Sequence, residues 1–252
     1  MDEIRSHARL MALGIACWLG LSPAWAQRPD PESLVRQADA FRQVYRDATM
    51  DIRLTRTVPG QPAEQSRLKV ALRGTNASLI RVTQGLQAGQ QVLMTDEGLW
   101  VKLPRSARSV RITPLQRLLG DAAVGDIGRM RWQDDYSAGF ADPAEAVVDG
   151  VAAWKLALDA RSPLATYARV EAALAKMDGR PLAAEFFLRS GKAAKRVRFG
   201  PVEAINDRQG IRRMELSDAL KADSRTDLLI EHVRPVTVDA RWFSLETLGQ
   251  WE

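Results

Sequence analysis

The fold is decided by the stretch from Gly98 to Ile127, which contains Gly98-Leu-Trp-Val-Lys-Leu-Pro104, then Arg105-Ser-Ala-Arg-Ser-Val-Arg-Ile-Thr113, then Pro114-Leu-Gln-Arg-Leu-Leu-Gly-Asp121. The first two parts predict a strand, a basic turn and a second strand. The third predicts a helix from Pro114 to Leu119, because Thr113 can cap its start, proline suits its first position and Gly120 can end it. Three leucines would share one face of this helix, namely Leu115, Leu118 and Leu119. So short a helix is unstable alone, and we expect its leucine face to lie against an apolar support.

The chain before this stretch alternates between apolar and polar residues, which is typical of half-buried strands. The predicted inward-facing residues of the first two strands are Met50, Ile52 and Leu54, followed by Leu68, Val70 and Leu72. Turn sequences recur at intervals of roughly ten residues, which favours an antiparallel meander. The alternation predicts burial, but it does not separate a ligand shelter from an ordinary core.

The chain after this stretch is also rich in short predicted strands. Asp149-Gly150 predicts a hairpin turn, and a last strand is expected over residues 226–238, with Pro235 suiting a sheet edge. Aromatic residues recur every four positions within 130–142, which fits a helical turn or an aromatic loop, and Asp134-Asp135 in it fits a solvated loop. Together with helices beginning near Pro31 and after Phe243, these patterns predict an α+β fold of about ten antiparallel strands. A closed barrel and a sandwich remain possible from pattern alone.

The N-terminus has the features of a secretory signal over residues 1–26. Its apolar run from Leu10 to Leu21 is too short for a permanent membrane span, and Ala24-Trp25-Ala26 suits cleavage after Ala26. Cys17 raises the alternative of a lipoprotein, but the leucine usual three positions earlier is missing. We therefore expect residues 27–252 to form a single exported domain that is soluble in the periplasm.

Catalytic and metal chemistry have little support in this sequence. Cys17 is the only cysteine, and His232 is the only histidine after the predicted cleavage site. There is no nucleophile-elbow serine, no metal-ligand spacing and no phosphate-binding glycine loop. The net charge of +5 comes from arginines spread along the chain, which does not indicate a nucleic-acid partner. The sequence therefore predicts a binding protein, with no catalytic residues, metal or cofactor, rather than an enzyme.

A family resemblance rests on the order of features in the opening stretch. The run Gly98-Leu-Trp-Val-Lys-Leu-Pro, the basic turn, Val110-Arg-Ile-Thr, and Leu119-Gly-Asp ahead of Gly125-Asp-Ile resemble the outer-membrane lipoprotein-sorting proteins. These form the LolA-like and LolB-like superfamily, and the chain is similar to its poorly characterised branch of larger proteins. It departs from the family pattern at Ala122-Ala-Val124, where the family has an aromatic residue and a serine.

The resemblance implies a curved, open half-barrel of antiparallel strands with short helices covering its concave face. It also implies a periplasmic carrier that binds lipid or the acyl chains of lipoproteins and delivers them toward the outer membrane. The alternative is an accessory lipid-binding subunit of an envelope lipid exporter, with an inner-membrane exporter as partner. The expected ligand-binding residues are the inward-facing set named above, with Leu115, Leu118 and Leu119 as part of a lid or, with nearly equal weight, of a fixed core.

Overall fold

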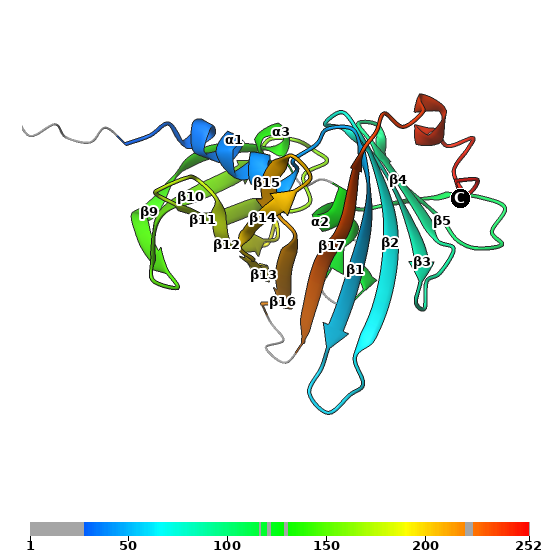
Figure 1. The fold of residues 1–252 in the computed structure, drawn as a ribbon, viewed down its shortest axis with the longest axis horizontal. Helices are drawn as coiled ribbons and strands as arrows, with labels where there is room; N and C mark the ends of the chain where they lie inside the picture. Colours follow the sequence, from blue (N-terminus) through cyan, green and yellow to red (C-terminus); the bar gives the residue numbers. More distant parts are fainter. Residues whose placement is uncertain (1–27, 116, 120–121, 129–130, 220–223, 252) are drawn as a thin grey trace, which may run out of the picture.

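The computed structural model describes residues 28–115, 117–119, 122–128, 131–219 and 224–251. Most of the strands form one antiparallel sheet of 13 strands in the order β6-β5-β4-β3-β2-β1-β17-β16-β13-β12-β11-β10-β9. The sheet is strongly curved and remains open, since β6 and β9 lie at its two edges (Figure 1). The predicted α+β half-barrel is therefore confirmed, and the closed barrel and the sandwich are excluded.

The sheet consists of two meanders joined where β1 pairs with β17. The first contains β1 (Ala48–Thr57), β2 (Glu64–Arg73), β3 (Ala77–Gln84), β4 (Gln91–Thr95), β5 (Gly98–Lys102) and β6 (Val110–Ile112). The second contains β9 (Tyr136–Val148), β10 (Val151–Ala160), β11 (Arg169–Ala175), β12 (Pro181–Phe187), β13 (Ala193–Phe199), β16 (Arg213–Asp218) and β17 (Arg225–Pro235). Because β17 returns beside β1, the last strand of the chain lies in the middle of the sheet. The prediction that Pro235 marks an edge strand is wrong: this proline is tolerated because it ends the strand.

The predicted register of the first two strands is confirmed. Met50 pairs with Val70 and Ile52 with Leu68, so these four side chains share one face of the sheet. They are buried in the main hydrophobic core with Leu54 and Leu72. This face is the concave one.

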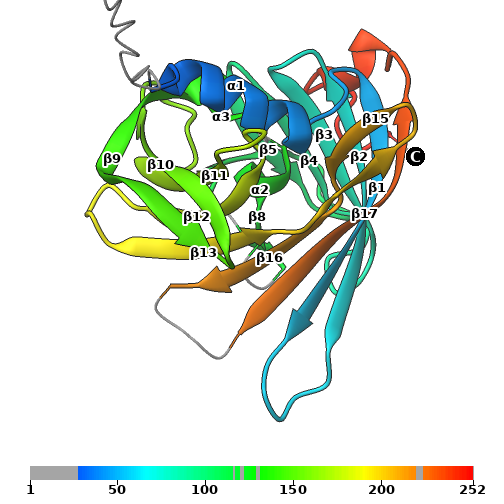
Figure 2. The same ribbon diagram turned by 60° about the vertical axis from the view of Figure 1, so that its left-hand side comes forward.

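Helix α1 (Pro31–Arg42) begins as its sequence predicts. The side chain of Asp30 accepts a hydrogen bond from Ser33 N at 2.9 Å, and Pro31 occupies the first turn. The apolar face of the helix buries Leu34, Val35 and Ala38. Helix α1 lies against α3 (Trp132–Asp135), β9 and the small hairpin of β14 (Val202–Ile205) and β15 (Arg208–Ile211), as Figure 2 shows.

The described residues between β6 and β9, which are 113–115, 117–119, 122–128 and 131–135, cross from one edge of the sheet to the other within its curve (Figure 2); we call them the crossing segment. It contains β7 (Arg117–Leu119), β8 (Ala122–Ala123), α2 (Val124–Gly128) and α3, and within the described residues β7 and β8 pair only with each other. Figure 2 places α2 and β8 inside the half-barrel. Ala122, Val124, Ile127 and Trp132 all belong to the main core. The concave face is therefore covered by the crossing segment rather than by a second sheet.

The predicted helix from Pro114 to Leu119 is wrong. Pro114 and Leu115 form a turn, and the residues that follow Gln116 form β7. In a helix the carbonyl of Pro114 would accept from the N–H of Leu118, but here it accepts from Gly125 N at 3.0 Å. A helix of this length returns too few hydrogen bonds to compete with such a tertiary contact. The position of Gly120 lies outside the described residues.

A second apolar cluster lies on the convex face. Leu248 and Trp251, near the C-terminus, pack against Ala71, Leu79 and Leu93 of β2, β3 and β4. The chain reaches this face through a 3-10 helix, η1 (Ala240–Phe243), so the terminal helix predicted after Phe243 lies slightly earlier and is shorter. The C-terminal residues thus cover the outside of the first meander.

Candidate functional site

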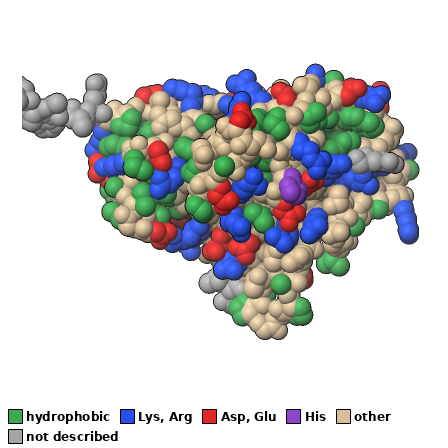
Figure 3. Space-filling model, in the orientation of Figure 1, with side chains coloured by type: hydrophobic (Ala, Val, Ile, Leu, Met, Phe, Trp, Pro, Cys, Tyr) green, Lys and Arg blue, Asp and Glu red, His purple; other side chains and the backbone are tan. Residues whose placement is uncertain are grey.

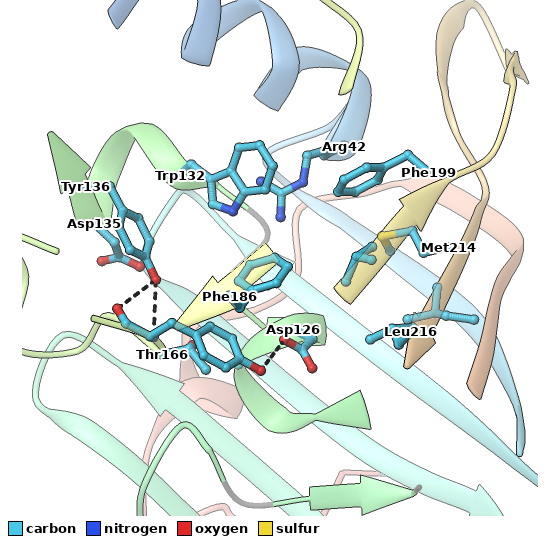
Figure 4. A pocket seen from close by; sticks show the side chains of 14 residues that line it. Arg42, Asp126, Trp132, Asp135, Tyr136, Thr166, Phe186, Phe199, Met214 and Leu216 are labelled. Atoms are coloured by element: carbon cyan, nitrogen blue, oxygen red, sulfur yellow. Dashed lines mark hydrogen bonds between the residues drawn. The ribbon is translucent and has the colours of Figure 1, made fainter. Parts of the chain in front are cut away.

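A small cavity lies where the crossing segment meets α1 and the second half of the sheet. We call it the aromatic cavity (Figure 4). It has a volume of about 30 Å³, enough for roughly one or two water molecules. It is lined by Arg42, Gly125, Asp126, Trp132, Asp135, Tyr136, Thr166, Tyr167, Phe186, Val197, Phe199, Met214, Leu216 and Leu228.

Rings from α3, β12, β13 and the loop before β11 pack around this cavity. Trp132 of α3 meets Phe199 of β13 edge-on, with ring centroids 6.0 Å apart, and Phe186 of β12 at 6.4 Å. Tyr167 lies 4.8 Å from Phe186. Such tilted and edge-on arrangements are the favoured ones for aromatic pairs. The rings therefore form a packed wall rather than a loose lining.

Arg42 and Asp39 bring charge to one side of the cavity. Arg42 Nη1 donates to Asp39 Oδ1 at 3.0 Å, and both side chains are almost fully buried. Asp39 also accepts from Trp132 N at 2.9 Å and from Gln133 N at 2.8 Å, so it caps the first turn of α3. Burial raises the pKa of Asp39, and Arg42 opposes that rise. Burial lowers the pKa of Arg42, and Asp39 opposes that fall.

A second buried ion pair anchors α2. Asp126 pairs with Lys195 of β13, and both side chains are less than a tenth exposed. Asp126 also accepts from Tyr167 Oη at 3.1 Å and from Ala123 N at 2.7 Å. Removing one partner of such a pair would leave a buried charge without compensation. This cluster is therefore a specific fastening between the crossing segment and the sheet.

Two further residues of the cavity lining make specific contacts: Tyr136 makes hydrogen bonds, and Gly125 packs closely against Thr166. Tyr136 Oη donates to the carbonyl of Tyr167 and accepts from its N–H, both at 3.2 Å, and burial raises the pKa of this hydroxyl. A Cβ at Gly125 would lie 2.9 Å from the Cβ of Thr166. Gly125 therefore permits close approach, and it does not have the positive φ of a turn glycine.

The apolar residues predicted as ligand-binding do not line the aromatic cavity. Met50, Ile52, Leu54, Leu68, Val70 and Leu72 are buried in the adjoining core. Leu54 is nevertheless directly opposite Leu228, which does line the cavity. The six predicted residues therefore form the part of the concave face that lies next to the cavity.

Of the three predicted lid leucines, the structure describes the side chain of Leu115. Leu115 is exposed at 41 % and lies beside an open pocket formed by residues 160–168 and 188–190. The side chains of Leu118 and Leu119 lie outside the described residues. No ligand contact is assigned to these leucines by the geometry.

The pattern analysis missed Arg42, Asp39, Asp126 and Lys195. A signal was present for each charged pair. Arg42 follows Leu34 and Ala38 at intervals of four, so helical spacing places it on the buried face. Lys195 precedes Val197 and Phe199 by steps of two, which places it on the concave face of β13.

The remaining polar groups give little support for catalysis. Asp135 is buried, which contradicts the predicted solvated loop, and its backbone carbonyl accepts from Arg161 N and Ser162 N. His232 is exposed on β17, and its neighbour Glu231 pairs with Arg53 at 3.2 Å. Within the described ranges, no group of three or more His, Cys, Asp and Glu residues could hold a metal ion.

The surface is mixed in charge. On the face drawn in Figure 3, Lys and Arg side chains alternate with Asp and Glu side chains and with small apolar areas. A broad basic area, as a nucleic acid would need, is not visible on that face. Among the described residues, none of the helices has the length and apolar character needed to cross a membrane.

Sequence comparisons place the chain in one family. A family model described as an uncharacterized protein matches residues 74–250. No curated protein is significantly similar in sequence to this chain.

Two solved structures share the fold over nearly their whole length. A LolA superfamily protein from Nitrosomonas europaea has a TM-score of 0.80 and 24% sequence identity, covering 88% of this chain and 100% of that one. A structure described as an outer membrane lipoprotein-sorting protein domain from Vibrio parahaemolyticus has a TM-score of 0.70 and 17% identity, covering 87% and 98%. At these identities the likeness shows a common fold.

Proposed function

Because this chain belongs to the family of uncharacterized proteins whose model it matches, and because it has the fold of the LolA superfamily, we propose that it is a periplasmic carrier for acyl chains. In this proposal, lipids or the acyl chains of lipoproteins are sheltered on the concave face and delivered toward the outer membrane. The proposal places the exported chain in the periplasm after removal of residues 1–26.

The observation that carries the proposal is the way the concave face is covered. Elements that cover a sheet face pack on it through apolar side chains and need not share the hydrogen bonds of the sheet. Here the cover is the crossing segment, whose two strands pair only with each other in the part of the chain that the structure describes. It is joined to the sheet at both ends and otherwise fastened by side-chain and turn contacts. Such a cover can leave an apolar face without disrupting the sheet.

The size of the aromatic cavity indicates that loading requires this movement. The cavity has room for roughly one or two water molecules. An acyl chain has about 15 methylenes, each roughly the size of a water, so it does not fit the cavity as it stands. An acyl chain would therefore enter by replacing apolar side chains of the crossing segment, such as Val124 and Ile127.

The energetics of this exchange suit a carrier. Leaving water stabilises an acyl chain by about 0.8 kcal/mol per methylene, or on the order of 12 kcal/mol for 15 of them. Exposing Val124 and Ile127 costs about 1.5–3 kcal/mol each, or about 3–6 kcal/mol together. This cost offsets up to about half of the gain from the acyl chain, so binding can be strong and still reversible.

The test is to express the full chain with its signal, purify it from the periplasm and record its mass under native conditions. We expect a species bound to acyl lipid, and we expect a fluorescent fatty acid to bind saturably after the lipid is removed. Protein that carries no lipid and binds no acyl probe would overturn the carrier proposal.

A further inference from the structure

The donors of Arg42 are incompletely used in the folded protein. A guanidinium has five N–H donors, and the hydrogen bond that Arg42 makes within the described chain is the one from Nη1 to Asp39. Its Nε is buried and has no hydrogen-bond partner. The side chain is only 7% exposed. A buried donor without an acceptor is costly, and more so in a charged group.

The neighbouring carboxylates are already engaged. Asp39 accepts two backbone N–H groups of α3 in addition to Arg42. Asp126 is taken by Lys195, Tyr167 and the backbone of Ala123. Asp135 has interactions of its own. A further acceptor for Arg42 would therefore come from outside the described chain.

The guanidinium is held in place and directed toward the aromatic cavity. Its central carbon lies 3.8 Å from the ring centroid of Trp132 and 5.8 Å from that of Phe199. Figure 4 shows Arg42 between these two rings, with Phe186 on the cavity side. Stacking of this kind fixes the orientation of the guanidinium and leaves its edges available for hydrogen bonds.

One wall of the cavity is apolar and continues into the concave face of the sheet. Leu216 and Leu228 line it, and Leu228 is opposite Leu54 in the sheet. The site thus presents a guanidinium that is paired with Asp39 and has unused donors, and beside it a wall of hydrocarbon. A ligand that suits both is an amphiphile with a negatively charged head.

We propose that the aromatic cavity binds the anionic end of an amphiphile, a carboxylate or a phosphate group, on the guanidinium of Arg42, with its acyl chain along the concave face. This inference rests on the proposed carrier function and narrows its ligand class. Arg42 is the group that selects an anionic head, because charge-assisted bonds from a guanidinium fork are stronger than bonds to a neutral ester. The simpler alternative is that a water molecule bonds Nε and that the head group is not recognised.

The experiment compares ligands that differ only in the head, by displacement of a fluorescent acyl probe at pH 8. The ligands are oleate, oleoyl lysophosphatidate and methyl oleate, with acetate and inorganic phosphate as heads without a chain. We expect at least one anionic amphiphile to bind about tenfold or more tightly than methyl oleate. Preference for oleate or for lysophosphatidate alone would identify the head as carboxylate or phosphate.

Variants locate the preference at Arg42. Arg42→Met should remove it, and Arg42→Lys should restore part of it. The control is Arg208→Met, which removes an arginine 4.6 Å from the ring of Tyr45 and outside the cavity, and which should keep the preference. If Arg42→Met fails to fold, Arg42→Lys, which keeps the positive charge beside Asp39, carries the test, and it should lower the preference.

Three results would overturn this inference. Equal affinity for oleate, lysophosphatidate and methyl oleate would leave the carrier proposal standing and show that the head is not recognised. A preference that survives Arg42→Met would assign it elsewhere. Competition by acetate or inorganic phosphate as strong as that of the amphiphiles would show a simple anion site. Failure of every acyl ligand to bind would instead contradict the carrier proposal itself.

Discussion

Leu54 lies on the concave face, with no exposed surface. Its cross-strand neighbours are Ser66 on β2 and Leu228 on β17. Thr55, the next residue, points to the opposite face and is partly exposed there. The two positions therefore differ in environment while sharing one strand.

We expect Leu54→Asp to destabilise the protein by about 4 kcal/mol or more, because it buries a carboxylate without a partner. Thr55→Lys is the matched control and should change the free energy of unfolding by less than about 1 kcal/mol, since it faces Gln65 and Asp227. Urea denaturation of both variants measures the difference. Equal stability of the two would contradict the assigned face.

Residues of this kind could be predicted from the sequence because their environment follows from position within one strand. The burial of Leu54 follows from the alternation of apolar and polar residues around it. The roles of Asp30 and Pro31 follow from their place at the start of a helix. Arg42 could have been placed on the buried face by the same local reasoning. The role of Arg42 could not be predicted, because the aromatic rings that it stacks on belong to residues 132 and 199, far away in the sequence.

At the scale of elements, the crossing segment is where local pattern fails. Its sequence has complete signals for a helix at Pro114, yet the carbonyl of Pro114 bonds to Gly125. Asp126 finds its partner 69 residues away at Lys195, and Gly125 is packed against Thr166. Contacts of such separation have no local sequence signal. The strands were predictable from local pattern, whereas the contacts that hold the crossing segment over them were not.

Lys195→Met tests whether the ion pair to Asp126 fastens the crossing segment. We expect faster amide exchange in residues 122–128 and faster exchange of bound acyl probe, while β1 and β2 stay protected. Lys155→Met is the control, because Lys155 pairs with Glu171 at a partly exposed site, where ion pairs contribute little. Unchanged exchange in 122–128 would show that the pair does not hold the segment.

Gly125→Val tests the close approach to Thr166. A side chain there would overlap Thr166, so we expect a lower melting temperature and a larger open population that loads acyl probe faster. The control is Gly139→Val, where a Cβ would meet nothing within 4 Å and φ is not positive. If both variants melt and load alike, the packing at Gly125 is not what closes the segment.

At the scale of the whole molecule, two apolar regions lie on opposite sides of one sheet. The concave region is covered by the crossing segment, and the convex region by the C-terminal residues around Leu248 and Trp251. The convex cover is also held by Gln91, whose side chain donates to the carbonyl of Trp251 at 2.8 Å and accepts from Gly249 N at 3.1 Å. We assign ligand binding to the concave side and structural support to the convex side.

Trp251→Ala should therefore separate stability from binding. We expect a loss of about 3 kcal/mol or more and a melting temperature lower by roughly 10 °C, since a large buried ring is removed. The number of acyl chains bound per protein should not change. Gln250→Ala, at an exposed neighbour, should leave both quantities unchanged. Loss of lipid from Trp251→Ala below its melting temperature would contradict this division.

The central claim is that acyl chains bind on the concave face, and photo-crosslinking tests it most directly. A fatty acid with a diazirine in its chain is bound to the protein, irradiated, and mapped to labelled peptides by mass spectrometry. We predict saturable labelling of peptides that contain Leu54, Leu216 or Leu228. Labelling confined to peptides that contain Leu79, Leu93 or Trp251, or labelling that excess unlabelled fatty acid does not reduce, would contradict the account.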